Sequence, residues 1–227
     1  MSMPIRTLLL PVSDAQLTAD IRWPAAPRAV VVFVHGSGSS RLSPRNQHVA
    51  GYLADRQFAT VLFDLLTEQE QRIDQFTASL RFDIELLSRR LIEVIDWLGG
   101  QVELASLPLG LFAASSGAAA ALRAAASRPE QVRAVVCRGG RSDLTGAMIG
   151  AVRAPTLQIV GALDPQVLAL NQTVCEQLRC QQQLQIIAGA SHLFAEPGAL
   201  EQVARLAGDW FAQHLSGKAA SRLPTQA

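Results

Sequence analysis

The sequence predicts an α/β protein: a mostly parallel central sheet with helices on both faces. Short, uninterrupted apolar runs recur along its 227 residues, and amphipathic segments alternate with them. Apolar runs without a polar face are typical of strands buried on both sides of a parallel sheet. No internal repeat or linker divides the chain, so we expect one domain at residues 1–215 and a flexible tail at 216–227.

The first elements are a hairpin, a buried strand and a helix. Residues Ile5 to Val12 and Leu17 to Trp23 alternate loosely on either side of a turn, which indicates an antiparallel pair. The run from Ala29 to His35 is continuously apolar and predicts a buried parallel strand. A Gly/Ser loop follows it, and Pro44 then marks the start of a helix.

The middle of the chain contains a second buried strand and a long helix. The strand is predicted at Thr60 to Leu65, and the polar stretch from Thr67 to Gln75 is interpreted as a loop. Apolar residues at spacings of three and four predict a helix from Ser79 to Leu98.

The second half continues the alternation of strands and helices. We predict strands at 107–113, 132–137, 156–160 and 184–188, and helices at 116–127, 165–178 and 197–215. This order of elements favours a doubly covered parallel sheet.

The composition excludes several classes of function. The chain has 20 Lys and Arg against 19 Asp and Glu, so a net charge of +1 gives no reason to expect nucleic acid or an anionic membrane as a partner. No apolar run is long enough for a membrane span or a signal peptide, and we expect a cytoplasmic protein. Its three cysteines lack the spacing of a metal site, and no metal or cofactor is expected.

The most informative segment is Ala113-Ala-Ser-Ser-Gly117, where a buried strand runs into an alanine-rich helix without a loop. Such a turn strains the central residue and lifts its side chain above the sheet, and it requires small residues on either side. Ser115 is therefore a candidate nucleophile. The alternative is that it only caps the helix.

A serine nucleophile needs a base and an orienting acid, and both candidates follow strands. Asp164 comes directly after the strand at 156–160, and His192 follows the strand at 184–188. Open α/β sheets place their sites at this edge. Separately, Asp164 could be a helix cap and His192 a structural residue, but the order Ser, Asp, His favours a triad.

The Gly-rich loop from His35 to Ser40 ends the first buried strand. Its backbone N–H groups can supply one half of an oxyanion hole, and the N–H of Ser116 the other. A phosphate-binding loop is the alternative, but the spacing of GxGxxG and a Lys-Ser/Thr pair are missing. We interpret His35 as a structural residue that shapes the loop.

From Val30 to Leu215 the chain resembles the α/β-hydrolase superfamily, and within it the small group related to dienelactone hydrolase. The resemblance implies Ser115, Asp164 and His192 as the triad, with main-chain donors at Ser37 and Ser116. Two departures are visible. Alanine stands at 113 where the family usually has glycine, and the nucleophile is serine where dienelactone hydrolase has cysteine.

Two further expectations concern the acid and the cleft. Some relatives place the acid one strand earlier, where this chain has Asp143, so that residue is the alternative to Asp164. The segment from Gly139 to Ala154 is too short for a helical cap domain, and we expect an open cleft for small substrates. Its expected lining is Ser39, Arg41, Leu66, Met148 and Phe194.

Together these features predict a serine hydrolase that cleaves a small carboxylic ester, lactone or thioester without a cofactor. An acyltransferase or perhydrolase could use the same triad, and a hydrolase-like binding protein would hold a ligand without cleaving it. The expected partner is a small-molecule ester, and the chain is expected to be a monomer or a homodimer.

Overall fold

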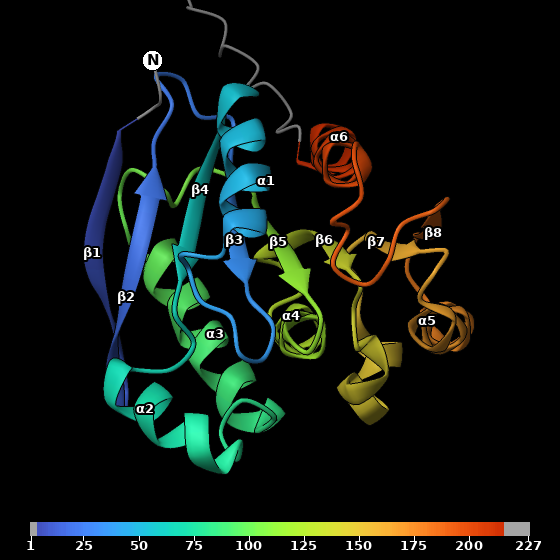
Figure 1. Cartoon of the computed structure of the whole chain (residues 1–227). Coiled ribbons are helices and arrows are strands. Elements are labelled where there is room, and N and C mark those ends of the chain that lie inside the picture. The colour runs from blue at the N-terminus through green and yellow to red at the C-terminus, as the bar shows by residue number, and fades with distance from the viewer. Residues whose placement is uncertain (1–3, 216–227) are drawn as a thin grey trace, which may run out of the picture.

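The structure, a computed structural model, describes residues 4–215, so the tail predicted at 216–227 lies outside the described residues. These residues form one eight-stranded sheet with the order β1-β2-β4-β3-β5-β6-β7-β8 (Figure 1). The strands are β1 (Ile5–Val12), β2 (Ala15–Arg22), β3 (Ala29–Val34), β4 (Phe58–Phe63), β5 (Leu109–Ala114), β6 (Val132–Arg138), β7 (Thr156–Gly161) and β8 (Gln182–Ile187). The hairpin β1–β2 joins β4 in antiparallel fashion, and the other neighbours are parallel. The predicted fold class is confirmed.

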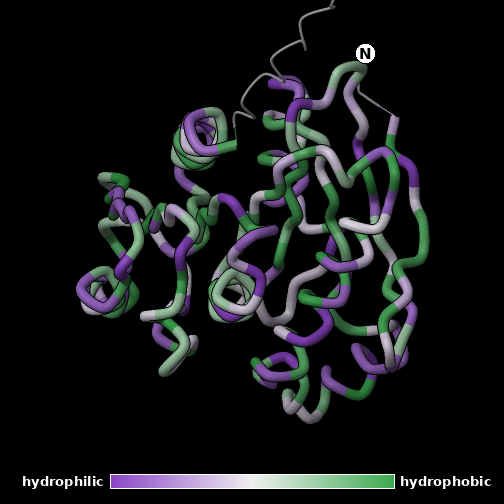
Figure 2. Tube along the Cα trace, turned by 180° about the vertical axis from the view of Figure 1, so that it is seen from behind, coloured by the Kyte–Doolittle hydropathy of each residue, from purple (hydrophilic) through white to green (hydrophobic). Residues whose placement is uncertain are grey.

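Helices cover both faces of the sheet. They are α1 (Pro44–Asp55), α2 (Glu68–Thr77), α3 (Ile84–Gly99), α4 (Gly117–Ser127), α5 (Pro165–Gln177) and α6 (Ala199–His214). Apolar side chains of α1 and α6 form one core with the sheet, and those of α3, α4 and α5 form the other. Figure 2 shows hydrophilic and hydrophobic residues within the same helices, as expected for elements with one buried face.

The central strands are apolar on both faces because each lies between two cores. Every residue of β3, β4, β5 and β7 is buried. This double burial explains why continuous apolar runs predict these strands correctly.

The interpretation of the polar stretch from Thr67 to Gln75 as a loop is wrong, because this stretch contains most of α2. The helix begins with a capping box in which the Thr67 hydroxyl accepts the Glu70 amide and the Glu70 carboxylate accepts the Thr67 amide. The helix buries only Asp74, so its sequence has no apolar stripe to reveal it. The next helix also starts later than predicted, at Ile84, because the Asp83 side chain caps it.

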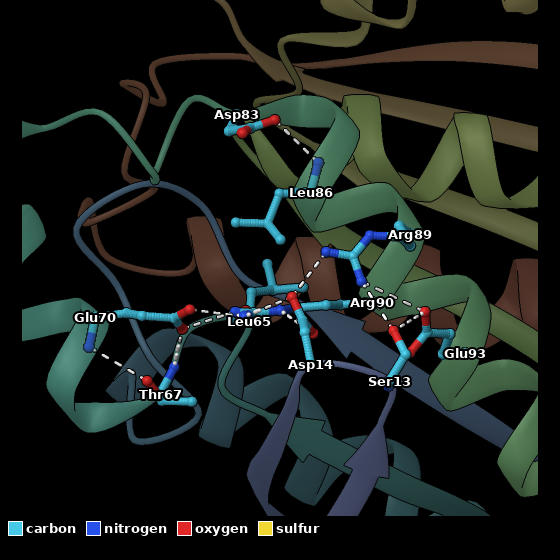
Figure 3. A network of polar contacts seen from close by, with 10 residues as sticks. All are labelled: Ser13, Asp14, Leu65, Thr67, Glu70, Asp83, Leu86, Arg89, Arg90 and Glu93. Carbon is cyan, nitrogen blue, oxygen red and sulfur yellow. Dashed lines mark hydrogen bonds and ion pairs between the residues drawn. The ribbon is translucent and has the colours of Figure 1, made fainter.

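A buried arginine fixes α2 and α3 to the end of β4 (Figure 3). The side chain of Arg90 is 1% exposed, and its guanidinium donates to the carboxylates of Glu70 and Asp14 and to the Leu65 carbonyl. Burial alone lowers the pKa of Arg90, but the hydrogen bonds to the two carboxylates outweigh it and the pKa is raised. This network holds the chain segment after β4, which forms one wall of the cleft described below.

Only a 3₁₀ segment, Ser142–Ala151, lies in the connection between β6 and β7. The expectation that no cap domain is inserted there is confirmed. Among residues 4–215, none of the helices has both the length and the apolar character that a membrane span requires.

Candidate active site

Ser115 occupies the turn between β5 and α4 and has a left-handed backbone conformation. Its φ is +49°, a region that residues with a side chain rarely adopt. The first α4 amides follow this turn directly, so Ser115 lies at the positive end of the helix. The alternative of a helix cap is not what the structure shows: the N-cap residue is Ser116, and no side-chain cap bond is present there.

The turn packs against the end of β3 so closely that glycine is required. A Cβ atom on Gly117 would lie 2.5 Å from the carbonyl oxygens of Val34 and His35, and one on Gly36 would lie 2.8 Å from Ser115 Cβ. These contacts bring the oxyanion loop against the candidate nucleophile. Ala113, where the family usually has glycine, is buried within β5.

We expect Gly117→Ala to destabilise the protein by roughly 2–3 kcal/mol, because the added methyl group meets backbone oxygens that cannot move aside. For a chain of this size that corresponds to a melting temperature lower by roughly 4–12 °C. The matched control is Gly51→Ala in α1, where a Cβ meets nothing within 4 Å. Thermal unfolding of both variants followed by circular dichroism tests this, and equal melting temperatures would show that the close packing is not needed.

The predicted acid and base are hydrogen-bonded to each other. The Nδ1 atom of His192 lies 2.6 Å from Oδ2 of Asp164. The alternative acid, Asp143, instead pairs with Arg141 through two contacts of 2.8 Å. The geometry therefore favours Asp164 as the residue that orients the imidazole.

The loops that carry the acid and the base are packed together by backbone contacts. The Leu163 amide donates to the Ala190 carbonyl at 2.9 Å, and a Cβ on Gly161 would lie 2.2 Å from the same carbonyl oxygen. The two side chains are consequently held as a pair.

Backbone contacts also place His192 beside Ser115. The Ser115 amide donates to the Arg138 carbonyl, and the Arg141 amide donates to the Ser115 carbonyl. Gly139 lies between Arg138 and Arg141 in the chain, and a Cβ on it would lie 3.3 Å from Cε1 of His192. No hydrogen bond joins the Ser115 hydroxyl to His192 within residues 4–215. Since Asp164 engages Nδ1, Nε2 is the ring nitrogen that remains for another partner.

The loop after β3 is shaped by His35, as the sequence predicts. Its Nδ1 lies 2.9 Å from the Gly36 carbonyl, and its Nε2 accepts the Leu65 amide at 3.1 Å. Burial lowers the pKa of His35, so the ring is neutral and joins two backbone segments.

The two expected oxyanion donors lie together but are not equivalent. The Ser37 amide donates to the Ser116 hydroxyl oxygen at 2.8 Å, so it would reach an oxyanion only by leaving that partner. The Ser116 amide has no hydrogen-bond partner among residues 4–215 and lies at the start of α4. No sequence pattern indicates the contact between Ser37 and the Ser116 side chain.

A cavity of about 240 Å³ opens beside the oxyanion loop. Ser39 and Leu66 line it, as expected. Two wall residues were not expected: Asp74, which is buried, and Arg81, whose Nε donates to the Asp74 carboxylate at 2.5 Å. Asp74 lies in α2, which the sequence does not predict, and Arg81 lies between α2 and α3, in a stretch predicted to be helical.

Three of the expected lining residues lie outside this cavity. Arg41 is held by an ion pair of 2.6 Å to Asp64 and another of 3.4 Å to Asp20, so it anchors the loop. Met148 lies over α3 and α4, in a different hollow of the surface. Phe194 is 1% exposed and belongs to the core that α1 and α6 form with the sheet. None of these three residues is part of the lining of this cavity.

Cys137 lies one residue before the end of β6 and faces the core beneath α4. Complete burial raises the pKa of its thiol to about 12. A thiol with that pKa is not a nucleophile at neutral pH.

Known proteins with this architecture include a dienelactone hydrolase from Anabaena variabilis. It is 47% identical to this chain, the match covers 95% of this chain and all of that protein, and the TM-score is 0.92. This chain belongs to the dienelactone hydrolase family. Within the α/β-hydrolase fold, more distant neighbours are an esterase of Pyrococcus furiosus and a dienelactone hydrolase-like phosphotriesterase from metagenomic libraries. The esterase is 15% identical, with coverage of 94% of this chain and 92% of that one and a TM-score of 0.76. The phosphotriesterase is 18% identical, with coverage of 96% of this chain and 100% of that one and a TM-score of 0.75.

A protein of Mycobacterium tuberculosis with the name "Putative phosphoribosyl transferase" is 56% identical over 194 residues. The match covers 86% of this chain and 43% of that protein, so this member of the dienelactone hydrolase family spans less than half of the curated relatives it matches. No protein-family model matches the chain.

Proposed function

We propose that the protein is a serine hydrolase that cleaves a small carboxylic ester, lactone or thioester. The observation that carries the proposal is the 2.6 Å contact between His192 and Asp164, made beside a serine whose φ is +49°. A strained serine at the start of a helix, with an oriented imidazole next to it, is the arrangement required for acyl transfer to a serine.

In the proposed reaction the Ser115 hydroxyl attacks the carbonyl carbon while His192 Nε2 takes its proton. Asp164 keeps the imidazole in the tautomer that leaves Nε2 free, and it stabilises the cation that forms. The Ser116 amide holds the oxyanion, and the Ser37 amide joins it by leaving the Ser116 hydroxyl. Each such donor is worth roughly 3 kcal/mol in enzymes of this kind. His192 then protonates the leaving group, and water releases the acyl group.

The size of the cavity supports a short acyl group. Its volume of about 240 Å³ is below the roughly 300–1,000 Å³ of sites that enclose drug-sized ligands. The connection after β6 adds no cap that could enlarge it.

Covalent labelling tests the proposed nucleophile without knowledge of the natural substrate. A fluorophosphonate is expected to modify the protein once, on the peptide that contains Ser115, and to abolish hydrolysis of p-nitrophenyl acetate in proportion to labelling. Modification at another residue with Ser115 unlabelled would contradict the proposal. A protein that is labelled at Ser115 but hydrolyses no ester, lactone or thioester would be an acyltransferase or a binding protein.

A series of p-nitrophenyl esters tests the size of the acyl group. We expect kcat/KM to be highest for acetate to butyrate and to fall at least tenfold by octanoate, because the longer chain extends beyond the cavity. A maximum at octanoate or longer would show that the acyl chain binds elsewhere.

The name of the Mycobacterium tuberculosis relatives points to another activity, phosphoribosyl transfer. More than half of those proteins lies outside the match. The matched part corresponds to a chain with the hydrolase arrangement described above. We therefore assign no phosphoribosyl transfer to this chain.

A further inference from the structure

Arg138 is the last residue of β6, and its backbone contacts the candidate nucleophile. Its carbonyl accepts the Ser115 amide at 3.2 Å. Its neighbour Cys137 faces the α4 side of the sheet, so Arg138 extends towards α1 and α6, where its guanidinium lies 5.8 Å from the centre of the Phe194 ring. Only 6% of the residue is exposed.

Among residues 4–215, the guanidinium of Arg138 has no partner of opposite charge. Its Nε is buried without a hydrogen bond, and within residues 4–215 neither terminal nitrogen donates to the protein. The terminal nitrogens are not among the fully buried atoms, so they account for accessible surface at the end of the side chain. Arg90 shows the contrast: it is also buried, but two carboxylates and a carbonyl accept its hydrogen bonds.

A second arginine adds its charge to this place. Arg45 lies in the first turn of α1, its Nε is also buried without a hydrogen bond, and it makes no ion pair with any described residue. Burial and then the nearby Arg45 cation lower the pKa of Arg138 to about 10. The first turn of α1 contains no acidic residue, so the positive end of the helix is not neutralised either.

Two guanidinium groups and a helix N-terminus without a carboxylate form a strongly unfavourable arrangement unless an anion joins them. A buried charge without a partner costs several kcal/mol. One carboxylate would leave a charge of +1 between the two arginines, whereas a phosphate monoester carries up to two negative charges. Its oxygens also match the forked donors of arginine and the amides of a helix start.

We propose that Arg45 and Arg138 form a binding site for a phosphate group beside Ser115, and that this group belongs to the substrate. The second part of this proposal rests on the proposed function, because a phosphate group on the substrate would make that substrate a phosphorylated ester. The binding of phosphate does not depend on catalysis and can be measured separately.

Inorganic phosphate is the probe for the site. Titration calorimetry at constant ionic strength is expected to show one phosphate bound to the wild type, with acetate binding at least tenfold more weakly. Arg138→Gln and Arg45→Gln should each weaken phosphate binding at least tenfold. The matched control is Arg133→Gln, which changes an exposed arginine near the other end of β6 and should bind phosphate like the wild type. No binding by the wild type, or equal binding by all variants, would overturn the proposal.

Stability without phosphate distinguishes a binding residue from a structural one. Because Arg138 is a buried cation without a partner among the described residues, Arg138→Gln should melt at the same temperature as the wild type or higher when phosphate is absent. Phosphate should then raise the melting temperature of the wild type but not that of the variant. A lower melting temperature for Arg138→Gln without phosphate would mean that the arginine supports the fold. If that variant does not fold, Arg45→Gln decides, since its side chain is only half-buried.

Inhibition kinetics separate a phosphate group of the substrate from free phosphate as an effector. Competitive inhibition of p-nitrophenyl acetate hydrolysis by inorganic phosphate, lost in Arg45→Gln, supports a substrate group. Binding without competition would overturn that assignment. A protein that binds phosphate at these arginines but hydrolyses no ester would refute the proposed function and leave the phosphate site intact.

Discussion

Ser115→Ala is expected to lower kcat for p-nitrophenyl acetate by at least about 10⁴-fold while the protein stays folded. The reason is that Ser115 occupies the strained turn, whereas the neighbouring Ser116 is buried and its hydroxyl accepts the Ser37 amide. The left-handed backbone at Ser115 is retained, because alanine adopts the same conformation at similar cost.

The measurement is steady-state hydrolysis with the melting temperature recorded for the same preparations. Ser127→Ala is a suitable control, because it removes a hydroxyl from the other end of α4. Its kcat should match that of the wild type. Turnover within tenfold of the wild type in Ser115→Ala would exclude this residue as the nucleophile.

Asp164→Asn is expected to have the second largest effect, a loss of kcat on the order of 10³–10⁴-fold. An amide has nearly the same shape as the carboxylate but lacks the charge that stabilises the imidazolium. It can also donate to Nδ1, and would then turn His192 into the tautomer that cannot take the serine proton.

Asp143→Asn is the comparison that decides which acid operates. Asp143 forms an ion pair with Arg141, so the kcat of the Asp143→Asn variant should stay within a few fold of the wild-type value. The two variants are to be compared over a range of pH, because a charge that orients the base affects kcat whereas a surface ion pair does not. A large loss in Asp143→Asn together with an active Asp164→Asn would reverse the assignment.

The sequence predicts the sheet well because its strands carry their own signal. Each central strand is buried on two faces and is therefore apolar throughout, and Ser115 is recognisable from the small residues that the turn requires. The order of strand ends then places Asp164 and His192 at the same edge. These features depend on local sequence and on the general rule for parallel sheets.

What the sequence does not predict depends on contacts between distant residues. Arg41 leaves the cleft because Asp64 and Asp20 hold it, and Phe194 is drawn into the core by a backbone turn with φ of +53°. Neither contact has a signature in the neighbouring residues. The same limit applies to Arg138, whose importance lies in the partners it lacks.

The order in which the strands pair has a consequence for how activity arises during synthesis. From β3 to β8 the sheet is extended strand by strand in chain order, apart from β4, and the proposed nucleophile follows β5, the proposed acid β7 and the proposed base β8. A chain still emerging from the ribosome can complete the serine turn while His192 has not yet been made. Because the proposed base follows the last strand, an incomplete chain would contain Ser115 but not the residue that activates it. In the proposed mechanism, hydrolysis therefore begins only after the last strand has joined the sheet.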